Sequence, residues 1–309
     1  MSETAKRILA GLALGAFAVG ALYFEVFNWV LPLVLILVFS LMGLYEFYHL
    51  TDRGLDGAPF RKLGFLFAIL IILGFYAHFL TIKTRFGFEP DATYAMFMHW
   101  FYPGENLAIL LIVFCFIVCS AAQLMTRPLD GAIYSILVTI GGIVYTTLTL
   151  GHGLLILAYP RGVFYLVFFV LLPILMDSGA YFVGRWFGRH NAGLKVSPRK
   201  TYEGYVGGII FTIAVANAVV WGWKEWANPG VREITFGHLE VSLLAFGMAI
   251  LSIFGDLAES AFKRDANIKD SASTIPGHGG MLDLADAIYF CLPVAFYYML
   301  VREMLGFGF

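Results

Sequence analysis

Residues 163–183 read VFYLVFFVLLPILMDSGAYFV. The stretch is apolar from Val163 to Met176, and a carboxylate, Asp177, follows directly. An α-helix needs roughly 20 predominantly apolar residues to cross the hydrocarbon core of a bilayer. The stretch is therefore predicted to form a membrane helix that carries a charged group near one end, and a charge in such a place is costly unless it has a function.

The composition extends this prediction to the whole chain. Of its 309 residues, 60% are hydrophobic and 13% charged, and the mean hydropathy is +0.81. A soluble domain is nearer half apolar and a quarter charged, so we expect an all-α, polytopic integral membrane protein. The net charge of −1 averages over two sides of a bilayer and indicates no partner. About nine stretches qualify as membrane helices: 8–24, 29–48, 63–82, 105–125, 132–158, 163–183, 205–223, 240–255 and 281–302.

Polar and charged residues are unevenly distributed along the chain. No internal repeat is apparent, so residues 1–309 are predicted to form one membrane domain, with 1–130 as scaffold helices and 131–309 as the catalytic part. Glu46 lies near the end of the second stretch, where a long polar side chain is expected to reach the interface. The cysteines lie inside apolar runs, which is typical of small hydrophobic filler.

The Lys and Arg residues favour one orientation. If every stretch crosses once, the two loops richest in basic residues, 184–204 and 256–280, lie on the same side as the N-terminus. Cytoplasmic loops carry an excess of Lys and Arg, so we expect the N-terminus and both loops in the cytoplasm. The two loops are then able to form one cytoplasm-facing site.

The loop before the last membrane stretch combines acidic, basic and glycine residues. Asp256, Glu259 and Lys263 have helical spacing, and Asp283 and Asp286 share a helix face three residues apart. Two short helical pieces are expected, joined by a glycine-rich turn whose backbone N–H groups can approach a phosphate. Oxygen ligands without Cys or His favour Mg²⁺, and cations beside them suit a nucleotide triphosphate. The alternative is a charged amphipathic loop held by salt bridges.

The second polar segment runs from Asp177 to Gly204. Arg185 and Arg189 are four residues apart, and a short loop then offers hydroxyls and cations. Such a segment is suited to anionic lipid headgroups or to a nucleotide. The alternative is that its charges only set the orientation of the protein.

Together the two segments resemble the phosphatidate cytidylyltransferase (CDP-diacylglycerol synthase) family, over about the last 130 residues. The matching positions are Asp177, Gly179-Ala180-Tyr181-Phe182, Gly184-Arg185, Phe187-Gly188, Ser197-Pro198, Lys200-Thr201, Glu203-Gly204, Gly255-Asp256-Leu257, Ser260, Lys263-Arg264, Lys269-Asp270, His278-Gly279-Gly280, Asp283 and Asp286. Two positions depart from the family: Leu284 stands where an Arg is usual, and Ala272 where a Gly is usual.

The resemblance implies transfer of CMP from CTP to phosphatidic acid, which forms CDP-diacylglycerol and pyrophosphate in phospholipid biosynthesis. It implies Mg²⁺, with a second cation, on Asp256, Asp283 and Asp286. The implied catalytic residues are Lys263, Arg264, Lys269, Asp270 and His278. The implied substrate-binding residues are Asp177, Arg185, Ser197, Lys200, Thr201, Glu203, Ser260, Gly279 and Gly280. It also implies the inner membrane of a cell and a homodimer, and no nucleic acid as partner.

Two other functions stay open at this point. Replacing an Arg by Leu284 removes a charge and a bidentate donor from a phosphate-handling site. Leu284 therefore motivates a catalytically weak relative, or one that acts on another lipid phosphate. The many membrane stretches also suit a carrier. A carrier usually places polar groups near the midplane in two related halves, whereas here they gather at one face in the later part of the chain.

Overall fold

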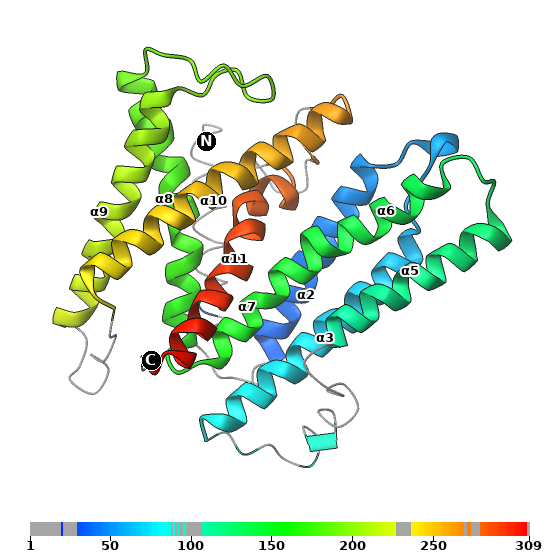
Figure 1. Cartoon of the computed structure of the whole chain (residues 1–309), viewed down its shortest axis with the longest axis horizontal. Coiled ribbons are helices and arrows are strands. Elements are labelled where there is room, and N and C mark those ends of the chain that lie inside the picture. Colours follow the sequence, from blue (N-terminus) through cyan, green and yellow to red (C-terminus); the bar gives the residue numbers. More distant parts are fainter. Residues whose placement is uncertain are drawn as a thin grey trace. The chain divides into compact units, whose positions relative to one another are not determined.

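The computed structural model of the chain describes residues 20, 30–87, 89, 92, 95–96, 107–226, 236–268, 271–272 and 279–307 (Figure 1). Within these ranges the regular elements are helices, and Asn191 and Thr201 form an isolated β-bridge. This confirms the all-α class. The elements are α2 (Val30–Leu50), the 3₁₀ turn η1 (Gly54–Asp56), α3 (Arg61–Arg85), α5 (Leu107–Thr126), α6 (Ala132–Gly142), the π-helical η2 (Ile143–Leu148), α7 (Thr149–Ala158), α8 (Gly162–Phe187), α9 (Tyr202–Trp226), α10 (His238–Asp265) and α11 (Met281–Met304).

Eight helical segments in the described part of the chain are long and apolar enough to cross a membrane, with α6, η2 and α7 counted as one. They correspond to the expected stretches from 29–48 to 281–302. The remaining expected stretch, 8–24, lies outside the described residues. The protein is therefore a multi-pass membrane protein, as its composition predicts.

α10 differs from the expectation. The sequence predicts a membrane stretch over 240–255 and a separate short helical piece after it, but α10 continues without a break to Asp265. The charged residues after Gly255 keep helical spacing, and Glu259 forms an i,i+4 ion pair with Lys263 at 2.5 Å. The charged face is therefore the last part of one long helix.

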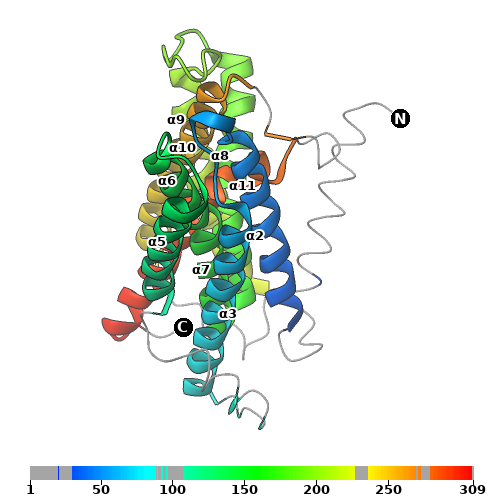
Figure 2. The ribbon, with the colours of Figure 1, turned by 90° about the vertical axis from the view of Figure 1, so that its right-hand side faces the viewer.

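The chain divides into two compact units. Unit 1 comprises Met1–Tyr159 and Asp265–Ala285, and unit 2 comprises Pro160–Arg264 and Asp286–Phe309. In unit 1, α3 packs against α2, α5 and α7 (Figures 1 and 2). In its most apolar window 61% of α3 is buried, against 17% for α5. α3 is therefore the centre of unit 1. The prediction of a division at residue 130 into scaffold and catalytic parts is not tested by this arrangement.

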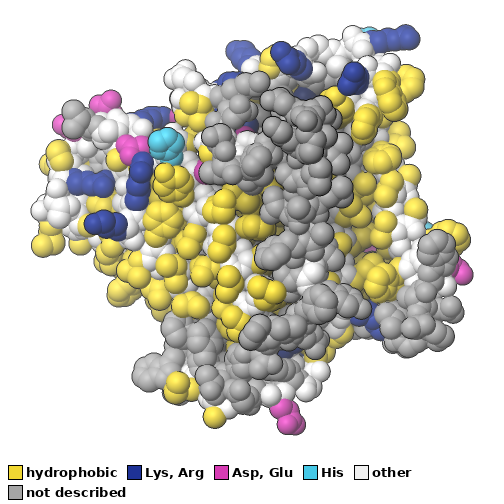
Figure 3. All heavy atoms as spheres, turned by 180° about the vertical axis from the view of Figure 1, so that it is seen from behind, with side chains coloured by type: hydrophobic (Ala, Val, Ile, Leu, Met, Phe, Trp, Pro, Cys, Tyr) yellow, Lys and Arg dark blue, Asp and Glu magenta, His cyan; other side chains and the backbone are white. Residues whose placement is uncertain are grey.

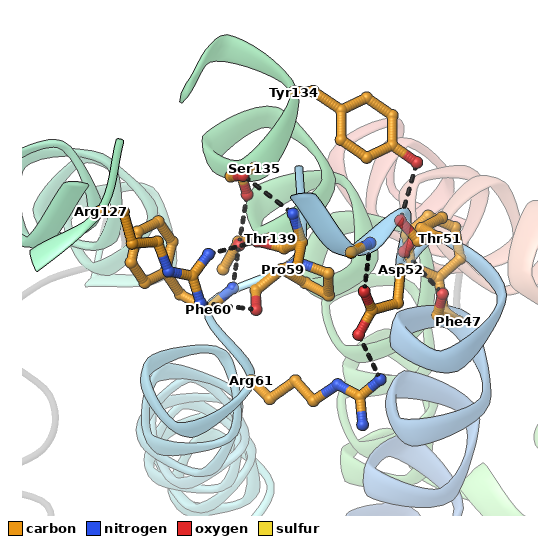
Figure 4. Close-up of polar contacts among 12 residues, drawn as sticks. Phe47, Thr51, Asp52, Pro59, Phe60, Arg61, Arg127, Tyr134, Ser135 and Thr139 are labelled. Carbon is orange, nitrogen blue, oxygen red and sulfur yellow. Dashed lines mark hydrogen bonds and ion pairs between the residues drawn. The ribbon is translucent and has the colours of Figure 1, made fainter. Parts of the chain in front are cut away.

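The connection between α2 and α3 is fastened to its neighbours by polar contacts (Figure 4). The Arg127 guanidinium donates to the Ala58 carbonyl at 2.6 Å and stacks 3.9 Å from the centre of the Phe60 ring. The Phe60 N–H donates to the Thr139 hydroxyl of α6 at 2.8 Å. Backbone groups that leave a helix need such partners away from water, so this connection has a defined conformation.

A hydroxyl pair joins α2 to η2 in the same unit. The buried Ser40 Oγ donates to Thr147 Oγ1 at 2.9 Å. Hydroxyl groups inside an apolar bundle are tolerated when they are hydrogen-bonded. The Ser40–Thr147 contact is thus an example of an ordinary buried hydrogen bond made by a side chain of α2.

Glycines bring α8 and α9 close together in unit 2. A Cβ atom on Gly208 would lie 2.8 Å from the Met176 carbonyl oxygen, and one on Gly204 would lie 2.9 Å from the Ala180 carbonyl oxygen. No real Cβ atom tolerates such distances, so both positions require glycine. Small residues at helix contacts are typical of membrane bundles because they let backbones approach.

α10 and α11 touch in unit 2 at a third such glycine. A Cβ atom on Gly255 would lie 2.7 Å from the Asp286 carbonyl oxygen. The Cys291 thiol contacts the Met248 carbonyl oxygen at 3.6 Å on the same pair of helices. All three cysteines are buried and free, which agrees with a packing role.

The described surface suits contact with lipid. Hydrophobic side chains cover much of the face in Figure 3 outside the grey atoms, and Lys and Arg gather mainly toward its margins. α5 exposes large apolar residues along its length: Ile109, Leu110, Val113, Phe114, Phe116 and Ile117. Exposed apolar surface of this extent marks a membrane-facing or partner-facing surface.

Candidate functional site

A cavity of about 580 Å³ with several charged residues in its lining lies in unit 2, where α8 ends and α9 begins. Helices α8, α9 and α10 and the loop between α8 and α9 form its wall. Its charged lining residues are Asp177, Arg185, Arg199, Lys200 and Asp256, and its other lining residues include Tyr181, Gly184, Thr201, Gly204 and Tyr205. The cavity therefore brings together residues from both polar segments of the sequence.

Helix α8 contributes residues from three successive turns to the cavity. Asp177, Tyr181 and Arg185 are four residues apart and lie on one helix face. The Arg185 guanidinium donates to the Tyr181 hydroxyl at 3.0 Å. Within the described part of the chain, the exposed Asp177 carboxylate makes no hydrogen bond or ion pair. Asp177 is therefore available to a ligand.

The close approach of two helices shapes the cavity wall. Gly184 of α8 and Gly204 of α9 both line it. A Cβ atom on Gly204 would lie 3.3 Å from the Gly184 Cα atom. Larger residues at these positions would push the helices apart or fill the cavity.

The loop between α8 and α9 carries Lys200 into the cavity. The loop closes as a hairpin, because the Ala192 N–H donates to the Lys200 carbonyl at 2.8 Å and the Tyr202 N–H donates to the His190 carbonyl at 3.1 Å. The Lys200 ammonium forms an ion pair with the Asp256 carboxylate of α10, and both side chains are about three-quarters buried, with 28% and 24% exposed.

The groups around Lys200 shift the pKa of its ammonium in opposite directions. Burial lowers the pKa of the Lys200 ammonium, and the carboxylates of Asp177 and Asp286 oppose this by raising its pKa. The positive charge of Lys263 lowers the pKa of Lys200, as burial does. Two carboxylates, one from α8 and one from α11, therefore favour the charged form of Lys200.

Several predicted binding residues lie outside the cavity lining. Glu203 accepts a hydrogen bond from the His190 N–H at 3.2 Å and pairs with its ring, so it fastens the hairpin. Ser197 donates its backbone N–H to the Leu194 carbonyl in a turn of that hairpin. Ser260 is on α10, one turn beyond Asp256, and does not line the cavity.

The predicted residues further along α10 and α11 are placed differently. Lys263 pairs with Glu259, whose side chain is 1% exposed, and Arg264 is exposed at the end of α10. Asp286 is buried in α11, and its Oδ1 accepts a hydrogen bond from the Ala287 N–H at 2.6 Å. The predicted catalytic residues Lys269, Asp270 and His278 lie outside the described residues.

Asp283 belongs to unit 1, at the start of α11. Its Oδ2 atom accepts hydrogen bonds from the Ser271 N–H at 2.9 Å, the Ser271 hydroxyl at 2.7 Å and the Gly280 N–H at 2.8 Å. Gly279 has φ of +87°, and a Cβ atom there would lie 2.6 Å from Asp283 Oδ2. The glycines thus form the turn into α11, and their role toward phosphate stays a prediction.

Glu46 does not lie at the interface, so that expectation was wrong. Its side chain is 1% exposed and accepts hydrogen bonds from the N–H groups of Met281 at 2.9 Å and Leu282 at 2.8 Å. The first N–H groups of a helix lack partners within it, and this carboxylate supplies them. The signal in the sequence was a carboxylate inside an apolar stretch, which usually has a partner elsewhere.

The donor set of the cavity fits Mg²⁺ bound together with a phosphate ligand. Among the described residues, no three His, Cys, Asp or Glu side chains are gathered as a metal cage. Asp177 and Asp256 nevertheless face the same cavity. Mg²⁺ is commonly held by one or two carboxylates plus substrate phosphates, so two carboxylates beside phosphate-binding cations are sufficient.

Comparison with known proteins gives the class. Residues 5–302 match the Cytidylyltransferase family, and the chain belongs to this family. It is 39% identical over 138 residues to a phosphatidate cytidylyltransferase of Haemophilus influenzae and 32% identical over 136 residues to one of Bacillus subtilis. These matches cover 45% and 44% of this chain, and about half of each relative, 46% and 47%. An uncharacterized Escherichia coli protein, YnbB, is 31% identical over 221 residues, which is 66% of this chain and 71% of that protein.

Proposed function

We propose that the protein transfers CMP from CTP to phosphatidic acid, forming CDP-diacylglycerol and pyrophosphate. The observation that carries this is the cavity of unit 2, which places two carboxylates and several cations at the ends of apolar helices. Membership of the cytidylyltransferase family and the names of the relatives point to the same reaction. A carrier is not favoured by this membership.

The reaction is a displacement at phosphorus. A phosphate oxygen of the lipid attacks the α-phosphorus of CTP, a new P–O bond forms, and the bond to the β-phosphate oxygen breaks to release pyrophosphate. The attacking phosphate is already an anion, so no strong general base is needed. The obstacle is the approach of two polyanions, and catalysis then consists mainly of positioning and charge stabilisation.

The residues of the cavity have different roles in this reaction. Arg185 offers a guanidinium fork that suits phosphate oxygens in pairs, and Lys200 offers a point charge beside it. Asp177 and Asp256 would hold Mg²⁺, which when bound neutralises phosphate charge and orients the leaving group. The sequence also predicts Asp283 and Asp286 as ligands, and a second cation, which stay predictions.

The location and assembly belong to the same proposal. The abundance of cations in the hairpin between α8 and α9 supports a cytoplasmic position for the cavity, and hence for the N-terminus, in the inner membrane. A homodimer is what the family resemblance predicts. Single cysteines in that hairpin should react with a membrane-impermeant thiol reagent only in inverted vesicles, and labelling in intact cells would contradict the orientation.

The direct test uses the full-length protein in mixed micelles with phosphatidic acid and CTP. We expect equal amounts of CDP-diacylglycerol and pyrophosphate when Mg²⁺ is present, and neither product after chelation. Nucleotide binding without pyrophosphate release would support the alternative of a catalytically weak relative. Absence of both binding and turnover with active lipid and metal present would contradict the proposal.

A further inference from the structure

A buried carboxylate of α2 holds the start of α11 in unit 1. Glu46 Oε1 accepts from the Met281 N–H at 2.9 Å, and Oε2 accepts from the Leu282 N–H at 2.8 Å. These groups are more than 230 residues apart in sequence, with separations of 235 and 236. The contact therefore joins a helix of the early, plainer part of the chain to the segment that carries the family pattern.

The first turn of α11 depends on carboxylates for its free N–H groups. Gly280, Met281 and Leu282 donate in succession to Asp283, Glu46 and Glu46. A negative charge is favourable beside the N-terminus of a helix, because the peptide dipoles point their positive ends toward it. Gly280 also has no room for a side chain, since a Cβ atom there would overlap Glu46 and Ser271.

The Ser271 side chain connects the two carboxylates. Its Oγ lies 3.0 Å from Glu46 Oε2 and 2.7 Å from Asp283 Oδ2. A hydroxyl has one hydrogen, so it donates to one carboxylate at a time. Ser271 and Gly280 both lie in the connection between α10 and α11, and both contact this carboxylate pair.

We propose that Glu46 is a positioning residue for the cytidylyl-transfer reaction. Its hydrogen-bond partners include the Ser271 hydroxyl and the backbone N–H groups of Met281 and Leu282. It fixes Ser271 and the first turn of α11, the helix that carries Asp286. The kinetic part of this inference rests on the proposed function, whereas the structural part does not.

A glutamine amide cannot replace both carboxylate oxygens of Glu46 as hydrogen-bond acceptors. Each oxygen faces a backbone N–H. Glutamine has the same size but one acceptor oxygen, so in Glu46→Gln either Met281 or Leu282 would face the NH₂ group. Glu46→Gln is therefore a minimal change that removes one acceptor and the charge while keeping the side-chain volume.

The structural test is hydrogen–deuterium exchange of the full-length protein, which needs no activity. Glu46→Gln should speed exchange at residues 280–283 by about tenfold or more, the factor expected for losing roughly one buried hydrogen bond. Ser40→Ala is the matched control, because Ser40 is also buried in α2 and loses one hydrogen bond, to Thr147. Unchanged exchange at 280–283 in Glu46→Gln, or an equal increase in Ser40→Ala, would overturn the inference.

The kinetic test separates positioning from plain stability. Per folded molecule, Glu46→Gln should lower kcat by about tenfold or more, since small displacements of reacting groups cost up to roughly a hundredfold, while Ser40→Ala stays within about twofold of wild type. Ser271→Ala should lower kcat in the same direction, and the double variant should lose less than the product of both effects. Multiplicative losses, or a normal kcat in folded Glu46→Gln, would overturn the positioning role.

The two proposals fail in different ways. If the wild-type protein forms no CDP-lipid, the proposed function fails, and the exchange experiment still decides whether Glu46 holds α11. If Glu46→Gln does not fold, the milder Ser271→Ala variant carries the same exchange and kinetic tests. Normal exchange and normal kcat in Ser271→Ala would then overturn the inference.

Discussion

Two groups of carboxylates in this protein have opposite hydrogen-bond environments. At the start of α11 in unit 1, Glu46 and Asp283 accept hydrogen bonds from successive backbone N–H groups and from a serine hydroxyl. In the cavity of unit 2, Asp177 has no such partner among the described residues and Asp256 faces a lysine. Buried carboxylates with full sets of donors build structure, whereas those that face a cavity beside cations are candidates for binding and catalysis.

The largest expected effect is at Asp256. Asp256→Asn should lower kcat/KM by about a hundredfold to a thousandfold, the range seen when one charge-stabilising group is lost from an active site. The measurement is CDP-diacylglycerol formation per folded protein. Asp265→Asn is the control, because Asp265 is 70% exposed and pairs with Arg53 in unit 1. Equal turnover in Asp256→Asn and wild type would remove Asp256 from the reaction.

Lys200 and Lys195 allow a comparison within one hairpin. Lys200 is partly buried and lines the cavity, whereas Lys195 is exposed and does not. Lys200→Ala should reduce kcat/KM for CTP by about ten- to a hundredfold, through the lost phosphate contact and the unpaired Asp256 carboxylate. Lys195→Ala should change it less than twofold. Similar losses in both variants would indicate a general role of positive charge in the loop.

The Mg²⁺ requirement should distinguish the carboxylates of the cavity from those at the start of α11. Asp177→Asn should raise the Mg²⁺ concentration for half-maximal activity by about tenfold, in line with the loss of about one ligand or of its support. Titration of Mg²⁺ at saturating CTP measures this. If the Mg²⁺ requirement is the same in Asp177→Asn as in wild type, Asp177 is not a ligand.

Asp283 belongs to the carboxylates at the start of α11, for which we expect a structural role. Asp283→Asn removes the charge from an acceptor of three hydrogen bonds, so we expect a loss of about 1–3 kcal/mol in stability with little change in the Mg²⁺ requirement. Thermal unfolding in detergent and the Mg²⁺ titration are to be compared. The sequence-based prediction of Asp283 as a metal ligand requires the reverse, a raised Mg²⁺ requirement.

The smallest expected effect is at Leu284. This side chain is 38% exposed on α11, at the position where the family usually has Arg. Leu284→Arg should raise kcat/KM by less than about tenfold, because the cations of the cavity already supply most of the charge. A gain of a hundredfold or more in the lipid-forming assay would show that Leu284 makes this protein a weak enzyme.

Much of the fold was predictable, because hydrophobic length is a local property of the sequence. Eight of the expected stretches are helices, and Asp177, Lys200 and Asp256 line one cavity, which agrees with the expectation that residues of both polar segments come together. The continuity of α10 through Gly255 was missed, since charge was taken as the end of a helix. A glycine that lets two backbones touch also marks a helix contact.

The role of Glu46 was not predictable from local patterns. Its partners, Met281 and Leu282, are backbone N–H groups far along the chain, and no side-chain pattern identifies them. Because Glu46 lies near the end of an apolar stretch, the sequence suggested that its side chain reaches the membrane–water interface. The general cost of burying a carboxylate indicated that a partner was needed, without indicating which one.

The most direct test of CMP transfer follows the label of CTP into the products. The full-length protein is incubated with phosphatidic acid, Mg²⁺ and CTP labelled at the α- or the γ-phosphorus. We expect the α-label only in the lipid product and the γ-label only in pyrophosphate, with both signals lost in Asp256→Asn. Transfer of the γ-label to lipid, or no labelled lipid from either substrate, would contradict the proposed reaction.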